Sequence, residues 1–194
     1  MKSSIVLGAG LQGVCVALAL ARAGHRVTIV DRASRALSGA SLRNEGKIHL
    51  GFVYAHDETG RTASLMLDAA LAFGPLMEEW LGMPVPWGRL KSVPFSYGLL
   101  HDSIAPDEEV FASWEQLSDR YRHRAPGERY LGEAPDRLWQ SVASPPLVTD
   151  RVRHVVRTAE VSIDTHAFQP LVCARLAAAD DVRGLMGHEI ASVA

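Results

Sequence analysis

Three apolar runs with different spacing open the chain, at residues 5–7, 11–23 and 27–30. The first and third are short and continuous, which is typical of strands buried in a sheet. The middle run is apolar on nearly every side, as expected of a helix packed beneath a sheet. Gly24 follows it at the position that glycine favours after a helix. The pattern therefore predicts a strand, a helix and a second strand within residues 3–31.

A longer helical pattern opens near Glu58, and prolines at 75, 84, 86 and 94 then interrupt the helical spacing. Four residues are predicted to lie along one side of this helix: Leu65, Met66, Ala69 and Phe73. Residues 106–121 predict an amphipathic helix with an acidic first turn. Its apolar face, a core stripe rather than a cofactor contact, consists of Val110, Phe111, Trp114, Leu117 and Tyr121.

The last third of the chain returns to strand character at residues 152–164. Thr165 is then predicted to cap a final helix, in which Pro170 is tolerated because it falls early. Short strand-like pieces follow this helix. Residues 86–163 together predict an α+β segment inserted between two α/β parts.

Composition narrows the class of protein. Apolar residues make up 47% of the chain and charged residues 22%, as in soluble globular proteins. The formal net charge of −2 gives no electrostatic basis for binding nucleic acid or an anionic membrane surface. Glycines and Gln12 interrupt the N-terminal apolar run, so we expect neither a secretory signal nor a membrane span.

The two cysteines, Cys15 and Cys173, are too few for a disulfide framework and lack metal-ligand spacing. Both fall in apolar helical patterns, which favours buried thiols in a reducing compartment. The sequence therefore predicts a cytoplasmic protein without a metal centre.

Two clusters of basic residues are candidate binding sites for an anionic group. The cluster at residues 119–129 is interspersed with acidic side chains, which favours a mixed, solvated surface. The second contains Arg151, Arg153, His154 and Arg157, any of which could bind a substrate carboxylate. The sequence does not select one of them.

The turn between the first strand and the helix carries Gly8, Gly10 and Gly13 in the spacing G-x-G-x-x-G. In a dinucleotide-binding unit the first glycine permits the tight turn, and the second lets the pyrophosphate approach the backbone. The third lets the helix lie close to the strand, and free N–H groups at the helix N-terminus meet the phosphates. Asp31 ends the second strand, where it can bind ribose hydroxyls and disfavours the 2′-phosphate of NADP. NAD and FAD both fit this unit.

Residues 5–73 resemble the opening of the D-amino-acid-oxidase-like FAD-dependent oxidoreductases, which include glycine and sarcosine oxidases. The stretch "ASLRNEGKIH" is similar to the second flavin-binding stretch of that group. The stretch "IHLGFVYAHD" also resembles L-2-hydroxyglutarate and glycerol-3-phosphate dehydrogenases. The resemblance implies an α/β fold, with a Rossmann-like FAD-binding domain and an inserted α+β substrate portion.

The resemblance also implies which residues contact FAD. Asp31 would hold the adenosine ribose, Ser41 and Arg43 would approach the pyrophosphate, and residues 44–48 would run past the isoalloxazine ring. Lys47 would place a positive charge near the ring, unless it is simply a solvated lysine. The full set implied is Gly8, Gly10, Leu11, Gln12, Gly13, Asp31, Arg32, Ala40, Ser41, Arg43, Asn44, Glu45, Gly46, Lys47, Ile48 and Ile190.

His49 follows the flavin-binding stretch, and the resemblance places it near the ring or the substrate. An imidazole there can accept a proton from an amine or hydroxyl as hydride leaves carbon. A structural histidine that holds the loop is the alternative, and the residues alone leave both open.

The predicted organisation is a first FAD-binding part at residues 1–85, a substrate portion at 86–163, and a returning helix and strand at 164–194. The implied activity is FAD-dependent oxidation of a small amine, amino acid or 2-hydroxy acid by hydride transfer to flavin. A binding-only dinucleotide domain and an NAD-dependent reductase are the alternatives. The resemblance spans about the first half of a typical family member, so we expect a fragment of a longer enzyme rather than a reduced relative.

Overall fold

The computed structural model describes residues 2–124, 128–143 and 150–192, which form two compact units. Unit 1 comprises Met1–Gly46, Leu76–Pro86 and Ile163–Ala194, and unit 2 comprises Lys47–Pro75 and Trp87–Ser162. The predicted organisation had grouped residues 47–75 with the first part of the chain. The structure groups this segment with unit 2 instead.

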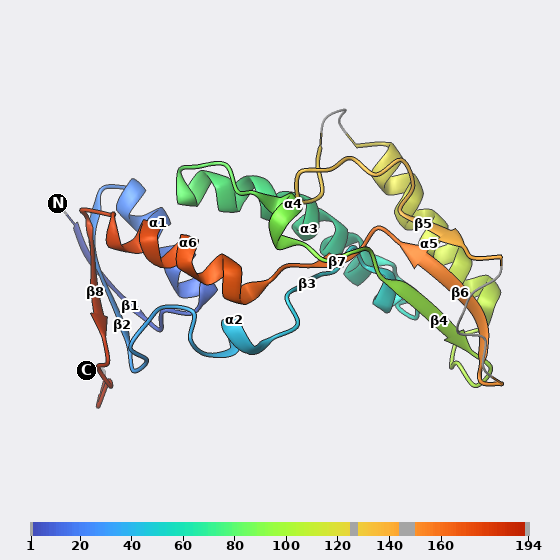
Figure 1. Cartoon of the computed structure of the whole chain (residues 1–194), viewed down its shortest axis with the longest axis horizontal. Coiled ribbons are helices and arrows are strands. Elements are labelled where there is room, and N and C mark those ends of the chain that lie inside the picture. Colours follow the sequence, from blue (N-terminus) through green and yellow to red (C-terminus); the bar gives the residue numbers. More distant parts are fainter. Residues whose placement is uncertain (1, 125–127, 144–149, 193–194) are drawn as a thin grey trace. The chain divides into compact units, whose positions relative to one another are not determined.

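Unit 1 contains a three-stranded parallel sheet in the order β1-β2-β8 (Figure 1). Strand β1 (Lys2–Leu7) leads into helix α1 (Leu11–Arg22), which returns the chain to β2 (His25–Asp31). The predicted strand–helix–strand unit is confirmed, and Gly24 has a φ of +81° just beyond the helix. Strand β8 (Val182–Met186) pairs with β2 near the end of the chain. The mixed α/β fold class is thereby confirmed.

One face of this sheet packs against helices. Helix α1 contacts β1 and β2, whereas α6 (Thr165–Ala177) contacts β8 and α1. Apolar side chains on this face are buried: Val6, Val27 and Ile29. On the opposite face, Ile5 is 70% exposed and Leu7 is 51% exposed.

The start of α6 differs from the prediction that Thr165 caps it. The cap is Asp164, whose carboxylate accepts a hydrogen bond from the Ala167 backbone N–H at 3.0 Å. Thr165 is the first helical residue, and its hydroxyl donates to the Leu42 carbonyl at 2.8 Å. Either side chain can cap a helix, and here the hydroxyl has a tertiary partner that takes it away from the helix end.

Unit 2 contains an antiparallel three-stranded sheet in the order β4-β6-β5 (Figure 1). Its strands are β4 (Ser96–Leu100), β6 (Val152–Thr158) and β5 (Trp139–Ser141). The predicted amphipathic helix is α5 (Asp107–Arg122), with Asp107 and two glutamates in its first turn. The chain's remaining short elements are α2 (Ala40–Arg43), β3 (Lys47–Ile48), η1 (Phe52–Tyr54), α4 (Trp87–Leu90) and β7 (Val161–Ser162).

An aromatic cluster joins α5 to the sheet of unit 2. Trp114 is 2% exposed, lies edge-on to Phe52 with ring centroids 5.4 Å apart, and donates from Nε1 to the Phe52 carbonyl at 3.0 Å. Phe111 stacks on Trp139 of β5 with ring centroids 5.5 Å apart. The aromatic stripe of this helix is therefore core packing, as predicted.

Helix α3 (Arg61–Leu81) has a different buried side from the one predicted. Leu65, which was assigned to the apolar side, is 61% exposed. The buried residues in its first half are Ala63, Leu67, Ala70 and Leu71, two of which are small. Small side chains permit close approach: a Cβ on Gly51 would lie 2.6 Å from the Ala63 carbonyl oxygen. None of the helices within the described ranges has the length and apolar character needed to cross a membrane.

Candidate flavin-binding and active site

A different structural feature explains the glycine at each of the three positions of the turn in unit 1. Gly8 has a φ of +96°, a conformation that glycine adopts readily, and its N–H donates to the Val30 carbonyl at 2.8 Å. A Cβ on Gly13 would lie 2.0 Å from the Gly8 carbonyl oxygen, so only glycine fits there. A Cβ on Gly10 would lie 3.4 Å from the Ser41 hydroxyl oxygen, on the side where the second flavin-binding stretch approaches.

Ser41 lies at the N-terminus of α1. Its hydroxyl oxygen accepts a hydrogen bond from the Leu11 backbone N–H at 3.0 Å. The helix cap, Gly10, offers no side-chain acceptor to the first-turn amides. An anionic phosphate suits this position, because helix N-terminal amides and a hydroxyl donor converge on it.

Asp31 connects the turn to the end of β2. One carboxylate oxygen accepts from the Ala9 N–H at 2.6 Å, and the other accepts from the Ala33 N–H at 2.7 Å. A carboxylate has about four acceptor positions, so each oxygen can accept one more hydrogen bond. Asp31 is half-buried rather than enclosed, and it can therefore bind ribose hydroxyls without losing its backbone contacts. These residues fit the adenosine and pyrophosphate parts of a dinucleotide.

The other predicted contacts in unit 1 are less constrained. Asn44 is held locally, because its side chain donates to the Ala40 carbonyl at 2.9 Å and accepts from the Gly46 N–H at 2.7 Å. Gly46 has a φ of +65°, and a Cβ there would lie 2.0 Å from the Ile163 carbonyl oxygen. Close packing against Ile163 therefore requires glycine at this position. The predicted contacts with exposed side chains are Gln12, Arg32, Ala40, Arg43 and Glu45.

Ile190 was matched to a strand that would lie beside the adenine. The strand of this region is β8, which ends at Met186, so Ile190 lies beyond it and is 39% exposed. Placing Ile190 on that strand was wrong. Strand β8 pairs with β2 from Val182 to Met186, and Met186 lies opposite Asp31.

Lys47, Ile48 and His49 belong to unit 2. The Lys47 ammonium lies 5.8 Å from the centroid of the Phe95 ring, within the range of a cation–π contact. Ile48 pairs with Val161 in the short antiparallel ladder between β3 and β7. His49 follows β3 directly, and its side chain is 29% exposed.

His49 faces a carboxylate that sequence reasoning did not single out. Its Nδ1 atom is buried and lies 3.6 Å from Oε2 of Glu160, whose side chain is fully buried. The Tyr97 hydroxyl donates to the same oxygen, whereas Oε1 accepts from the backbone N–H groups of Leu50 and Gly51 at 2.6 and 3.2 Å. Burial and the hydrogen bond to Glu160 raise the pKa of Tyr97 above its usual range, so the phenol stays protonated and donates.

Tyr130 braces the two segments that carry His49 and Glu160. Its hydroxyl donates to the Ile48 carbonyl and accepts from the Val161 N–H at 3.1 Å. Burial raises the pKa of Tyr130, which keeps this hydroxyl a donor. The sequence analysis assigned no role to this tyrosine. Its partners are backbone atoms distant in sequence, which leave no local signal.

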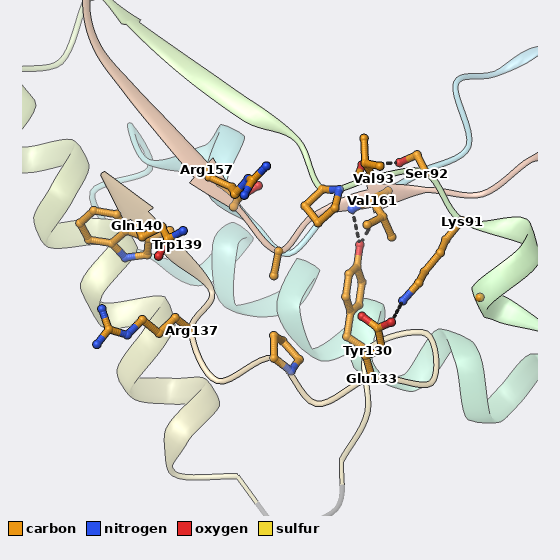
Figure 2. A pocket seen from close by; sticks show the side chains of 15 residues that line it. Lys91, Ser92, Val93, Tyr130, Glu133, Arg137, Trp139, Gln140, Arg157 and Val161 are labelled. Carbon is orange, nitrogen blue, oxygen red and sulfur yellow. Dashed lines mark hydrogen bonds and ion pairs between the residues drawn. The ribbon is translucent and has the colours of Figure 1, made fainter. Parts of the chain in front are cut away.

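A pocket of about 500 Å³ in unit 2 lies beside Tyr130 (Figure 2). Figure 2 shows Arg157, Gln140 and Trp139 along one side, with Tyr130, Glu133 and Lys91 on the other. Lys91 forms an ion pair with Glu133. Both a cation and hydrogen-bonding groups therefore line a cavity that can admit a small molecule.

The residues of the second basic cluster differ in their interaction partners. Arg153 and His154 both contact the Asp107 carboxylate, at 2.7 and 3.0 Å, and Arg151 also has a partner. Arg157 has no ion-pair partner within the described ranges, and it lines the pocket. It lies between Ser96 on β4 and Gln140 on β5 in the sheet register.

The first basic cluster is a mixed surface, as predicted. Arg122 pairs with Glu115 and Asp119, and Arg120 pairs with Asp68 at 2.7 Å. Arg124 pairs with Asp68 as well as Glu128. These cations are therefore occupied by neighbouring carboxylates.

A parallel β–α–β unit with a glycine turn and an acid at the end of its second strand defines a dinucleotide-binding α/β protein. A family model described as FAD dependent oxidoreductase (DAO) matches residues 4–189. Because this match covers nearly the whole chain, the chain belongs to the family of FAD-dependent oxidoreductases. FAD is the cofactor of this family, and the turn, Ser41 and Asp31 fit its adenosine and pyrophosphate parts.

Among curated proteins, the chain is similar to D-amino acid dehydrogenases. It is 40% identical to that of Cereibacter sphaeroides over 73 residues, which cover 38% of this chain and 17% of the relative. It is 46% identical to that of Neisseria meningitidis over 48 residues, which cover 25% of this chain and 12% of the relative. The matched region is therefore a small part of these relatives.

Solved structures show the same fold at low sequence identity. The L-proline dehydrogenase of P. horikoshii has a TM-score of 0.59 at 16% identity, covering 97% of this chain and 45% of that one. The glycine oxidase of Geobacillus kaustophilus has a TM-score of 0.55 at 17% identity, covering 97% and 47%. The chain thus spans less than half the length of these structures.

Proposed function

We propose that this protein oxidises a small amino acid at the carbon that bears its amino group, with FAD as the oxidant. The α C–H bond breaks, its electron pair leaves as hydride, and an amine proton is lost as the carbon–nitrogen double bond forms. The substrate is oxidised by two electrons and the flavin is reduced by two. When bound, FAD supplies the hydride acceptor. The observation that carries the proposal is the glycine turn of unit 1 in a chain of this family. In this turn Asp31 and Ser41 accept hydrogen bonds from the backbone N–H groups of Ala9 and Leu11.

In this proposal, residues of unit 1 hold the adenosine and pyrophosphate parts of the cofactor. Asp31 accepts hydrogen bonds from the adenosine ribose. The Ser41 hydroxyl, held by the Leu11 N–H at the N-terminus of α1, donates to the pyrophosphate. Lys47 would place a positive charge near the flavin ring, which would stabilise negative charge there. The further proposed contacts are Gly8, Gly10, Gln12, Gly13, Arg32, Ala40, Arg43, Asn44, Glu45, Gly46 and Ile48, with residues 1–85 and 164–194 as the FAD-binding part.

His49 takes the amine proton. Its ring has one buried nitrogen facing Glu160, and the exposed 29% of the side chain belongs to its other atoms. A histidine ring can accept a proton in such a step.

Arg157 binds the substrate carboxylate. Every amino acid carries this group, and a guanidinium binds it through two parallel hydrogen bonds. Arg157 is supported over its cluster neighbours because it lines a pocket, whereas Arg153 and His154 are engaged with Asp107.

An absorption spectrum of the purified full-length protein tests the cofactor. Bound flavin absorbs visible light, whereas NAD does not. Anaerobic addition of single D- and L-amino acids, glycine or proline should then bleach the flavin band. A protein that binds NAD alone, or that holds flavin which no amino acid reduces, would contradict the proposed function, and bleaching by 2-hydroxy acids alone would reassign the substrate class.

We place the protein in the cytoplasm as part of this proposal. Cys15 and Cys173 are both free thiols, which is typical of proteins in a reducing compartment. The net charge of −2 and the paired arginines near α5 support a small-molecule substrate rather than a nucleic acid. Cell fractionation with an antibody tests the location.

A further inference from the structure

Glu160 is a carboxylate in an unusual position. It lies in the short connection between β6 and β7 of unit 2, and its side chain has no exposed surface. Removing a carboxylate from water is unfavourable unless hydrogen bonds or charges compensate for the lost hydration. The groups that contact the Glu160 carboxylate therefore indicate its role.

Three hydrogen bonds reach the Glu160 carboxylate. Oε1 accepts from the backbone N–H groups of Leu50 and Gly51, which satisfies both acceptor positions of that oxygen. Oε2 accepts from the Tyr97 hydroxyl, its one hydrogen-bond donor among the residues that the structure describes. A carboxylate oxygen has two acceptor positions, so one on Oε2 is left, and Nδ1 of His49 lies 3.6 Å from this oxygen.

The same juxtaposition follows from the backbone. Lys47 pairs with Ser162, and Ile48 pairs with Val161, in the antiparallel ladder of β3 and β7. One step further along this register, His49 comes opposite Glu160. Side chains directly opposite in an antiparallel pair lie within interaction distance. Tyr130 fixes this register by bonding to the backbone of both segments.

The protonation of His49 Nδ1 decides whether this contact is attractive. This nitrogen is buried and has no hydrogen-bond partner within the described residues. If Nδ1 carried its lone pair, two acceptors would face each other without water between them. If Nδ1 carries the proton, a donor faces the remaining acceptor position of a buried carboxylate, which is a charge-assisted contact.

We infer that Glu160 is a positioning residue that holds His49 in its Nδ1–H tautomer, leaving Nε2 as the proton-accepting nitrogen. A purely structural role, anchoring Leu50, Gly51 and Tyr97, explains the three hydrogen bonds. It does not explain why a buried imidazole nitrogen faces the one vacant acceptor position. The tautomer follows from the contact itself, and its consequence for catalysis rests on the proposed function.

The test is the tautomer of His49 in the full-length protein, read from long-range proton–nitrogen correlations of ¹⁵N-labelled histidine. His49→Gln identifies the signals. In the wild type we expect the proton on Nδ1. In Glu160→Gln the amide nitrogen replaces Oε2 as the neighbour of Nδ1, so a donor faces this nitrogen and the proton should move to Nε2. A wild-type His49 with its proton on Nε2 overturns the inference whether or not the variant folds.

Tyr97→Phe is the matched control. It removes a hydrogen bond from the same Oε2 atom but retains the Glu160 carboxylate, so His49 should keep the Nδ1–H tautomer. A tautomer that is identical in the wild type, Tyr97→Phe and Glu160→Gln would reduce Glu160 to a structural anchor and overturn the inference.

Anaerobic flavin reduction by an amino acid gives the second readout. Glu160→Gln should slow reduction by about 100-fold or more, the scale of general-base catalysis, without a matching rise in the substrate concentration at half-maximal rate. If no amino acid reduces the wild-type flavin, the proposed function fails while the tautomer measurement still decides the role of Glu160. A tautomer switch with an unchanged reduction rate would reject the catalytic consequence alone.

Discussion

In unit 1, the groups proposed to hold FAD come from one nearly continuous stretch, with the glycine turn and Asp31 within residues 8–31. In unit 2, the groups around His49 come from distant segments: Leu50 and Glu160 are 110 residues apart, and Tyr97 and Glu160 are 63 apart. Unit 1 fixes its geometry by backbone sterics, since Gly13 has no room for a Cβ. Unit 2 fixes its geometry by a buried charge and its hydrogen bonds. Substitutions in unit 1 should therefore act mainly through steric clashes, and those in unit 2 through lost hydrogen bonds and charge.

Gly13→Ala should have the largest effect. Its Cβ would lie 2.0 Å from the Gly8 carbonyl oxygen, a backbone atom that cannot move without displacing α1. We expect a loss of about 3 kcal/mol or more in the free energy of unfolding, measured by urea titration. Gly88→Ala is the control, because a Cβ there meets no atom within 4 Å. Equal stability of both variants would remove the steric explanation of the turn.

Asp31→Asn should weaken FAD binding by about 1.5–3 kcal/mol, the contribution of a hydrogen bond to a charged group. The amide keeps one oxygen acceptor but loses the charge and one of the two backbone contacts. Fluorescence titration of the apoprotein with FAD measures the effect. A variant that is less stable but binds FAD with unchanged affinity would show that Asp31 is only a brace for the turn.

Arg157→Met should raise the amino-acid concentration needed for half-maximal flavin reduction by about tenfold, through loss of a charged hydrogen bond to the substrate carboxylate. Methionine keeps much of the apolar stem. Arg153→Met, which removes a cation paired with Asp107, is the matched control and should leave this concentration unchanged. Equal effects of the two variants would point to general electrostatics rather than a specific contact.

Ser41→Ala should have the smallest effect, a loss of about 1 kcal/mol in FAD affinity. The Leu11 N–H loses its hydroxyl partner, but the helix amides still face the pyrophosphate. Isothermal titration of FAD into the apoprotein resolves a change of this size. A loss as large as that of Asp31→Asn would mean that the hydroxyl, rather than the helix terminus, dominates phosphate binding.

The sequence predicted unit 1 well because its signals are local. Glycines at fixed spacing and an acid at a strand end constrain each other within one βαβ unit, and the structure contains that unit. The predicted apolar side of α3 was wrong because apolar residues occur on several sides of this helix, and tertiary packing selects the side with Ala63, Leu67 and Leu71 for burial. The helix cap was placed on Thr165, since the tertiary contact of its hydroxyl with Leu42 was invisible in the sequence.

Glu160 and Tyr97 could not be predicted by the same reasoning. Glu160 stands among apolar residues near a strand end, where a lone acid resembles any solvated side chain. The proposed role of Glu160 depends on the strand register that places His49 opposite to it. Register between distant segments depends on tertiary packing. An acid between Ala159 and Val161 in a strand-like stretch was the one signal available, because burying it requires partners.

The division of roles between the units is tested by comparing Gly10→Val with His49→Gln in the full-length protein, each measured for FAD affinity and for anaerobic flavin reduction by the same amino acid. Gly10→Val should fold but bind no FAD, because a branched side chain toward Ser41 occupies the space of the pyrophosphate. His49→Gln should bind FAD with wild-type affinity and reduce it about 100-fold more slowly or worse. Tight FAD binding by Gly10→Val, or a wild-type reduction rate in His49→Gln, would contradict this division.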